Sequence, residues 1–137
     1  MVVEISKHAL EGMKEHAERG YPDEVCGVMM GDGGVVSEFA ECRNLNTERA
    51  HDRYELDPLS FNSADTAARE KNLNIVGIYH SHPDHPARPS ETDRVRAWGG
   101  WGYLIMSIEK GSLKDSTLWY LNEETGQFER ADFSVRD

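Results

Sequence analysis

The 137-residue sequence predicts a single mixed α/β (α+β) domain, residues 1–137, with a largely antiparallel sheet flanked by helices. The length suits one domain. No apolar run approaches the roughly 20 residues of a membrane span. Short apolar runs rich in β-branched residues alternate with segments of helical periodicity, in the order βαββαβαβββ.

The first half of the chain predicts strands on either side of one amphipathic helix. Val2–Ile5 is a short apolar strand, and Ser6 is placed to cap a helix over 7–19. Four apolar residues spaced for one face of that helix are Ala9, Leu10, Met13 and Ala17. Glu24–Gly31 and Val35–Cys42 then read as a hairpin around Asp32-Gly33-Gly34.

The second half adds two helices and the rest of the sheet. A polar loop over 44–53 and a brief strand over 54–56 lead to a helix that Asp57 caps and Pro58 begins, ending near Lys71. Leu73–His80 predicts a central strand covered on both faces. The prolines of Ser81–Pro89 predict a loop, and Ser90 begins a short helix that ends near Trp98. Three strands finish the sheet: 102–108, 112–122 and 127–135.

Composition excludes several classes of partner. The chain has 25 acidic and 15 basic residues, a net charge of −10, so neither nucleic acid nor an anionic membrane is the expected partner. No signal peptide pattern opens the chain, and we expect a cytoplasmic protein. Cys26 and Cys42 have no zinc-finger spacing and read as buried free thiols.

Histidines cluster where the predicted central strand ends. His80 and His82 are two residues apart, so in an extended backbone they point to the same face and form a natural pair of metal ligands. Two surface histidines in a polar loop are the alternative. Asp93 follows Ser90 by three residues, which suits either a helix capping box or a third ligand. Two histidines and one carboxylate with an open fourth position form a catalytic zinc arrangement.

A hydrolytic zinc site also needs a base. Glu24 is the best remote candidate, because it stands where an apolar strand begins; an exposed acid at a strand start is the alternative. The residues from His80 to His85 also match the HxHxDH motif of metallo-β-lactamases, but no histidine follows His85. The chain also contains single pieces of three other patterns. It is too short for the barrel of amidohydrolases, which runs to ~250 residues, and it has Pro86 and Ala87 where a cupin needs a glutamate. It also lacks the cysteine pair of zinc deaminases.

Taken together, Glu24, His80-x-His82, seven residues and then Ser90-x-x-Asp93 resemble the JAMM (MPN-plus) zinc metalloprotease family. The resemblance covers about residues 1–122. It implies Zn²⁺ held by His80, His82 and Asp93, with Glu24 as general base and Ser90 as donor to the oxyanion. It also implies a curved sheet flanked by helices, in a layered architecture like that of cytidine deaminases.

The same resemblance implies a substrate class. Family members cut peptide or isopeptide bonds after the C-terminal glycines of ubiquitin or ubiquitin-like proteins. This chain is similar to the compact prokaryotic members, which favours a small ubiquitin-like sulfur-carrier protein, or its C-terminal adduct, as partner. A deubiquitinase-like or general peptidase, and a non-catalytic MPN scaffold, are the alternatives. We expect His85 to be a solvated loop residue, and Trp98, Trp101 and Trp119 to lie in the core or an interface.

Overall fold

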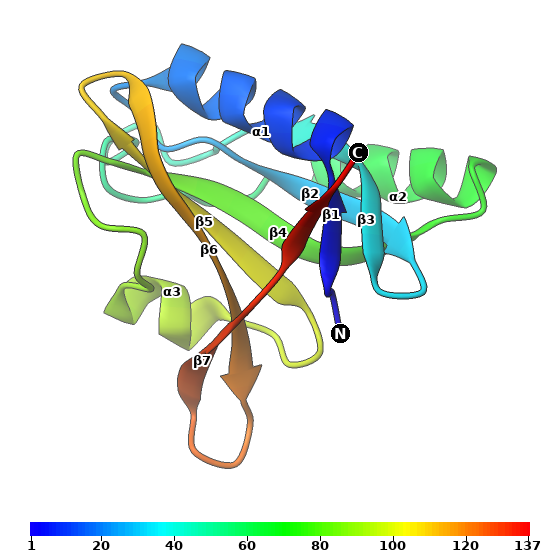
Figure 1. Cartoon of the computed structure of the whole chain (residues 1–137). Coiled ribbons are helices and arrows are strands. Elements are labelled where there is room, and N and C mark those ends of the chain that lie inside the picture. The colour runs from blue at the N-terminus through cyan, green and yellow to red at the C-terminus, as the bar shows by residue number, and fades with distance from the viewer.

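The computed structural model describes residues 1–137 and contains one mixed sheet of eight strands with three helices (Figure 1). The sheet order is β7-β6-β5-β4-β2-β3-β1-β8. In chain order the elements are β1 (Glu4–Ser6), α1 (Lys7–Gly20), β2 (Cys26–Asp32), β3 (Val35–Cys42), α2 (Pro58–Glu70), β4 (Asn74–Pro83), α3 (Glu91–Arg96), β5 (Gly102–Glu109), β6 (Ser112–Asn122), β7 (Gln127–Ala131) and β8 (Ser134–Arg136). Four of the seven neighbouring pairs are antiparallel, so the predicted mixed, largely antiparallel sheet is confirmed.

The sheet is strongly curved, because its two edge strands are neighbours in the sequence. β7 and β8 lie at opposite ends of the sheet order, yet only Asp132 and Phe133 separate them. The sheet must therefore curl until its edges approach, and Figure 1 shows the C-terminal segment passing from β7 to the side of β1. The predicted single strand over 127–135 is wrong for this reason: Phe133 packs on the core, and the Ser134 amide donates to the Val3 carbonyl.

Each face of the sheet is covered by one long helix. α1 packs with β1, β3 and the middle strands over a core that includes Ile5, Met13 and Tyr79. α2 covers the opposite face through the small residues Ala64 and Ala68. No helix in the structure has both the length and the apolar character needed to cross a membrane.

The helix starts follow the capping residues. The Ser6 side chain accepts a hydrogen bond from the Ala9 amide at 3.1 Å, and the Asp57 side chain accepts one from the Leu59 amide at 3.1 Å. α3 begins after Ser90 as predicted, but it ends at Arg96 instead of near Trp98. Ala97 already has an extended backbone, and two glycines follow Trp98, so the helix cannot continue.

The central strand is longer than the sequence predicts. β4 continues through Ser81, His82 and Pro83, which were expected to lie in a loop. These residues pair with β5, with Ser81 beside Met106 and Pro83 beside Ile108. A proline is tolerated there because β2 begins opposite His80, so Pro83 has no ladder partner on that side. Both histidines therefore project from regular strand, which fixes their directions more tightly than a loop would.

Candidate metal centre

The pairing of β2 with β4 places Glu24 beside the histidines. In this antiparallel pair Cys26 lies opposite His80. One residue further on, the Ser81 amide donates to the Val25 carbonyl at 3.1 Å, and the Val25 amide donates to the Ser81 hydroxyl at 2.9 Å. The same register carried one more residue brings Glu24 opposite His82. Glu24 is only 6% exposed, so the alternative of an exposed strand-start acid is excluded.

Three ligand atoms converge at the end of β4. The Nε2 atoms of His80 and His82 are 3.2 Å apart. The Oδ2 atom of Asp93 lies 3.3 Å from the first nitrogen and 3.1 Å from the second. Glu24 offers a carboxylate oxygen within 4.8 Å of both imidazoles, so each of the two carboxylates lies beside the histidine pair. Such a set of imidazole and carboxylate groups suits a divalent transition metal.

The capping box of α3 positions Asp93. The Asp93 amide donates to the Ser90 hydroxyl at 3.1 Å, and the Ser90 amide donates to Oδ2 of Asp93 at 2.9 Å. The oxygen that accepts this bond is the one beside both histidines. The two roles weighed for Asp93 from the sequence are therefore compatible, because one carboxylate caps the helix and faces the cluster.

Contacts outside the cluster orient both imidazoles. His82 donates from Nδ1 to the Pro86 carbonyl at 2.9 Å, so in the neutral imidazole Nε2 carries the lone pair. The His80 ring stacks on Tyr54 with a centroid distance of 4.5 Å. Nδ1 of His80 is buried without a hydrogen-bond partner. Ring directions are thus set before any ligand binds.

Burial and neighbouring charges pull the acidic pKa values apart. Burial raises the pKa of Glu24 to about 8, with Asp93 and Asp52 adding to the effect and His82 opposing it. Burial alone would raise the pKa of Asp93, but the adjacent His80 and His82 hold it far below its usual range. The site therefore contains one carboxyl group that is readily protonated and one that stays ionised, an arrangement typical of functional sites.

A polar cavity opens beside the cluster. Its volume is about 350 Å³, and eight of its nine lining residues are polar or charged, Pro86 being the exception; the nine are Glu24, Asp52, Arg53, His82, His85, Pro86, Arg88, Ser90 and Thr92. Oε1 of Glu24 is buried without a hydrogen-bond partner. The Ser90 hydroxyl accepts from the Asp93 amide, which leaves its own proton free to donate. A buried carboxyl group and a hydroxyl donor thus line one cavity.

Asn44, which the sequence did not single out, joins the segments on either side of this cavity. The Asn44 amide nitrogen donates to the carbonyls of Glu24 and Arg53, each at 3.1 Å. Its Oδ1 accepts from the amides of Asn46 and Glu55. An asparagine in a polar loop carries no signal of its own in one sequence, because only the folded chain brings these partners together.

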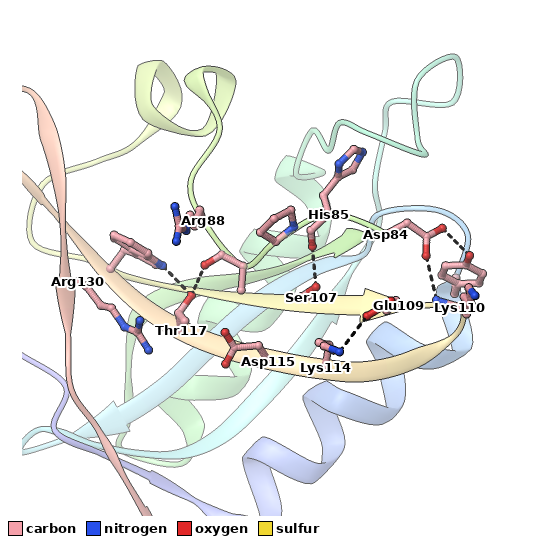
Figure 2. A pocket seen from close by; sticks show the side chains of 14 residues that line it. Asp84, His85, Arg88, Ser107, Glu109, Lys110, Lys114, Asp115, Thr117 and Arg130 are labelled. Atoms are coloured by element: carbon pink, nitrogen blue, oxygen red, sulfur yellow. Dashed lines mark hydrogen bonds and ion pairs between the residues drawn. The ribbon is translucent and has the colours of Figure 1, made fainter.

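The loop between the histidines and α3 is fixed from below (Figure 2). The Ser107 hydroxyl of β5 donates to the His85 carbonyl at 2.6 Å, and the Thr117 hydroxyl of β6 donates to the Ala87 carbonyl at 2.5 Å. A groove of about 1010 Å³ runs over these strands next to the metal cavity, and His85, Pro86 and Arg88 line both. Two side chains from neighbouring strands thus hold the loop that joins His82 to Ser90.

The other residues considered in the sequence differ in burial. His85 is exposed, as expected for a solvated loop residue, and Cys26 and Cys42 are buried free thiols, as expected. Trp101 lies against Phe61 with a centroid distance of 5.7 Å. Trp98 is 70% exposed, which excludes it from the core.

Comparison with known proteins agrees with this geometry. Residues 6–122 match the family model Prok-JAB, prokaryotic homologs of the JAB domain. A desampylase of Haloferax volcanii is 38% identical over 110 residues, 75% of this chain and 78% of that protein. A CysO-cysteine peptidase of Mycobacterium tuberculosis is 35% identical over 92 residues, 67% of this chain but only 63% of that protein.

Solved structures share the fold. A protein from Desulfitobacterium hafniense superposes with a TM-score of 0.85 at 25% identity, over 99% of this chain and 94% of that one. A structure described as "JAMM: a metalloprotease-like zinc site in the proteasome and signalosome" superposes with a TM-score of 0.61 at 19% identity, over the full length of both chains. The second likeness concerns the fold alone.

Fold, buried ligand cluster and relatives define a hydrolase of the JAMM/MPN class. Within that class, the chain belongs to the Prok-JAB family.

Proposed function

We propose that this protein is a zinc-dependent peptidase that cleaves the bond after the C-terminal Gly-Gly of a small ubiquitin-like protein. His80, His82 and Asp93 would hold the zinc ion, Glu24 would act as general base, and Ser90 would donate to the oxyanion. The observation that supports this best is the convergence of three ligand atoms, from β4 and α3, within 3.1–3.3 Å of one another.

The spacing of these atoms suits zinc. Ligand atoms at about 2.0–2.1 Å from a tetrahedral zinc ion are roughly 3.3 Å apart. The tautomer of His82 leaves Nε2 available as a ligand, and Asp93 is held as an anion. Three protein ligands with a fourth open position are typical of catalytic zinc sites, whereas structural sites are closed by four.

Bound zinc would supply a water of lowered pKa, a Lewis acid for the scissile carbonyl, and a positive charge that favours the ionised form of nearby carboxyls. Glu24 then accepts the proton from the attacking water and later delivers it to the leaving nitrogen. The unpartnered, buried Oε1 is available for this proton. Ser90 donates its free hydroxyl proton to the oxygen on which negative charge develops.

The proposed substrate follows from the cavity and the relatives. Glycines on the acyl side let the backbone approach a buried cluster without a side-chain clash. A desampylase and a CysO-cysteine peptidase are among the relatives, which supports a ubiquitin-like conjugate or a sulfur-carrier adduct as substrate. A cytoplasmic location stays a prediction from the sequence.

Metal analysis joined to a cleavage assay tests the proposal. We expect one zinc per chain after reconstitution, and release of the ubiquitin-like protein with a free glycine carboxylate, measured by intact mass. A chelator should abolish turnover and added zinc should restore it. Asp93→Ala should lose both metal and turnover, whereas His85→Ala should keep the metal. A wild-type protein that binds no zinc would contradict the proposal and favour a scaffold role.

A further inference from the structure

Two arginines that line the metal cavity have no acidic partner. Arg53 and Arg88 form no ion pair, and neither guanidinium donates a hydrogen bond within the protein. Four of the other eight arginines pair with acids: Arg19 with Glu41, Arg49 with Asp52, Arg69 with Asp65 and Arg94 with Glu91. Arg53 and Arg88 are distinguished by their position, because both line one small polar cavity beside the ligand cluster, where two free guanidiniums can bind one anion.

Both arginines are anchored through their backbones. Asn44 holds the Arg53 carbonyl together with the Glu24 carbonyl, which ties this arginine to the proposed base. The Arg88 amide donates to the Pro86 carbonyl at 2.8 Å. The preceding residue, Ala87, is held through its carbonyl by the Thr117 hydroxyl. Figure 2 shows the Arg88 side chain outside the interactions drawn among the groove residues. Fixed backbones with free side chains suit recognition of a ligand.

The acidic residues that line the cavity form no ion pair with these arginines. Asp52 and Glu24 are the acidic residues lining the cavity. Asp52 is already ion-paired with Arg49, and Glu24 is buried. Guanidinium groups present forked donors that match a carboxylate in two parallel hydrogen bonds. A cavity of about 350 Å³ is large enough for one amino-acid residue and too small for a folded domain.

We propose that Arg53 and Arg88 bind the α-carboxylate of a leaving group that is a single amino acid, so that the enzyme prefers a carrier extended by one residue. The inference rests on the proposed function and adds the chemistry of the leaving side. An α-carboxylate always lies two bonds from the leaving nitrogen, so it falls within the same small cavity as Glu24. In the amide of a longer peptide or an isopeptide, no charge stands at that position.

The reaction balances without a further reactant. The oxygen of water adds to the glycine carbonyl carbon, and the carbon–nitrogen bond breaks. The leaving nitrogen takes the proton that Glu24 accepted from water. The products are a chain ending in a glycine carboxylate and one free amino acid.

Short peptides separate this inference from the proposed function. The zinc-loaded protein is assayed with acetyl-Ala-Gly-Gly-Ala as the free acid, with its C-terminal amide, and with acetyl-Ala-Gly-Gly joined to the side chain of a lysine amide. We expect kcat/KM for the free acid to exceed that for the other two roughly 10- to 100-fold, the range for hydrogen bonds to a charged group. R53Q and R88Q should each lower this ratio about tenfold. R43Q is the matched control, because Arg43 is exposed, unpaired and outside both cavities, and it should keep the ratio.

A binding measurement covers the case of slow turnover. The free acid should shift the side-chain Nε–H resonances of Arg53 and Arg88 in NMR titrations, and the amide should not. Equal hydrolysis of acid and amide overturns the inference while leaving the proposed function intact. If neither peptide is hydrolysed, activity on short peptides fails and the titration alone decides. Equal binding of acetyl-Ala-Gly-Gly-Asp-amide would show that an acidic side chain is recognised, which also overturns the inference.

Discussion

Asp93→Asn separates the two roles of this side chain. Oδ2 of Asp93 accepts a hydrogen bond from the Ser90 amide at 2.9 Å and lies 3.1–3.3 Å from both imidazoles. An asparagine oxygen can still accept the bond from Ser90, but it brings no negative charge. We therefore expect α3 to keep its capping box while the affinity for zinc falls.

The size of the effect can be bounded. Changes to groups that only orient a ligand typically cost 10- to 100-fold in metal affinity. Asp93 is proposed as a ligand itself, and its side chain is buried and lies 3.1–3.3 Å from both imidazoles. Its neutral replacement should therefore weaken zinc binding by at least about 100-fold. Since the cap survives, the free energy of unfolding of the metal-free protein should change by less than the ~1 kcal/mol of a lost cap.

Competition with a chromophoric zinc chelator at neutral pH measures the affinity, and chemical denaturation measures the stability. Ser90→Ala is the control, because it removes the side-chain cap and keeps the carboxylate. It should lose about 1 kcal/mol of stability and still bind zinc. An Asp93→Asn protein that binds zinc as tightly as the wild type would refute the ligand role, as would a Ser90→Ala protein that loses zinc to the same degree.

Three further expectations concern the surroundings of the site. Glu24→Gln should keep zinc and lose nearly all turnover, since the proton acceptor is gone; full activity would remove Glu24 as base. Asn44→Ala leaves two carbonyls and two amides without their partner and should lower the free energy of unfolding by about 2–3 kcal/mol, measured by denaturant titration. Burial lowers the pKa of His16, whose ring hydrogen-bonds the Tyr79 hydroxyl at 2.7 Å. The contribution of neutral His16 to the free energy of unfolding is therefore complete above pH 6.5, and it is lost as the pH falls below that value. In metal-free protein, His16→Gln should reduce the fall in the free energy of unfolding between pH 7.5 and 5.5. An unchanged fall would contradict this reasoning.

The order of the strands connects these predictions to the fold. β4 lies centrally, with β2 on one side and β5 on the other, so the ends of three strands meet at the cluster. Ser107 and Thr117 reach the loop from β5 and β6. A change in that support should move Ser90 and Asp93 together, because the capping box joins them.

Local patterns in the sequence determined the three helices and most strands. Ser6, Asp57 and Ser90 cap helices in the structure because a short oxygen-bearing side chain satisfies amides within three residues of itself. The two-residue spacing of His80 and His82 likewise determined that their side chains share a face. These features depend on neighbours in the chain, so one sequence contains the information.

Only the tertiary structure decided what lies beside these elements. The pairing of β2 with β4 buried Glu24 against His82, although 57 other residues separate them in the sequence. Pairing with β5 extended β4 through Pro83, and the closing of the sheet turned one predicted strand into β7 and β8. Asn44, Arg53 and Arg88 acquired their places from loops whose course depends on partners in distant strands. Long-range pairing is set by how the whole sheet buries its apolar faces, which no local pattern specifies.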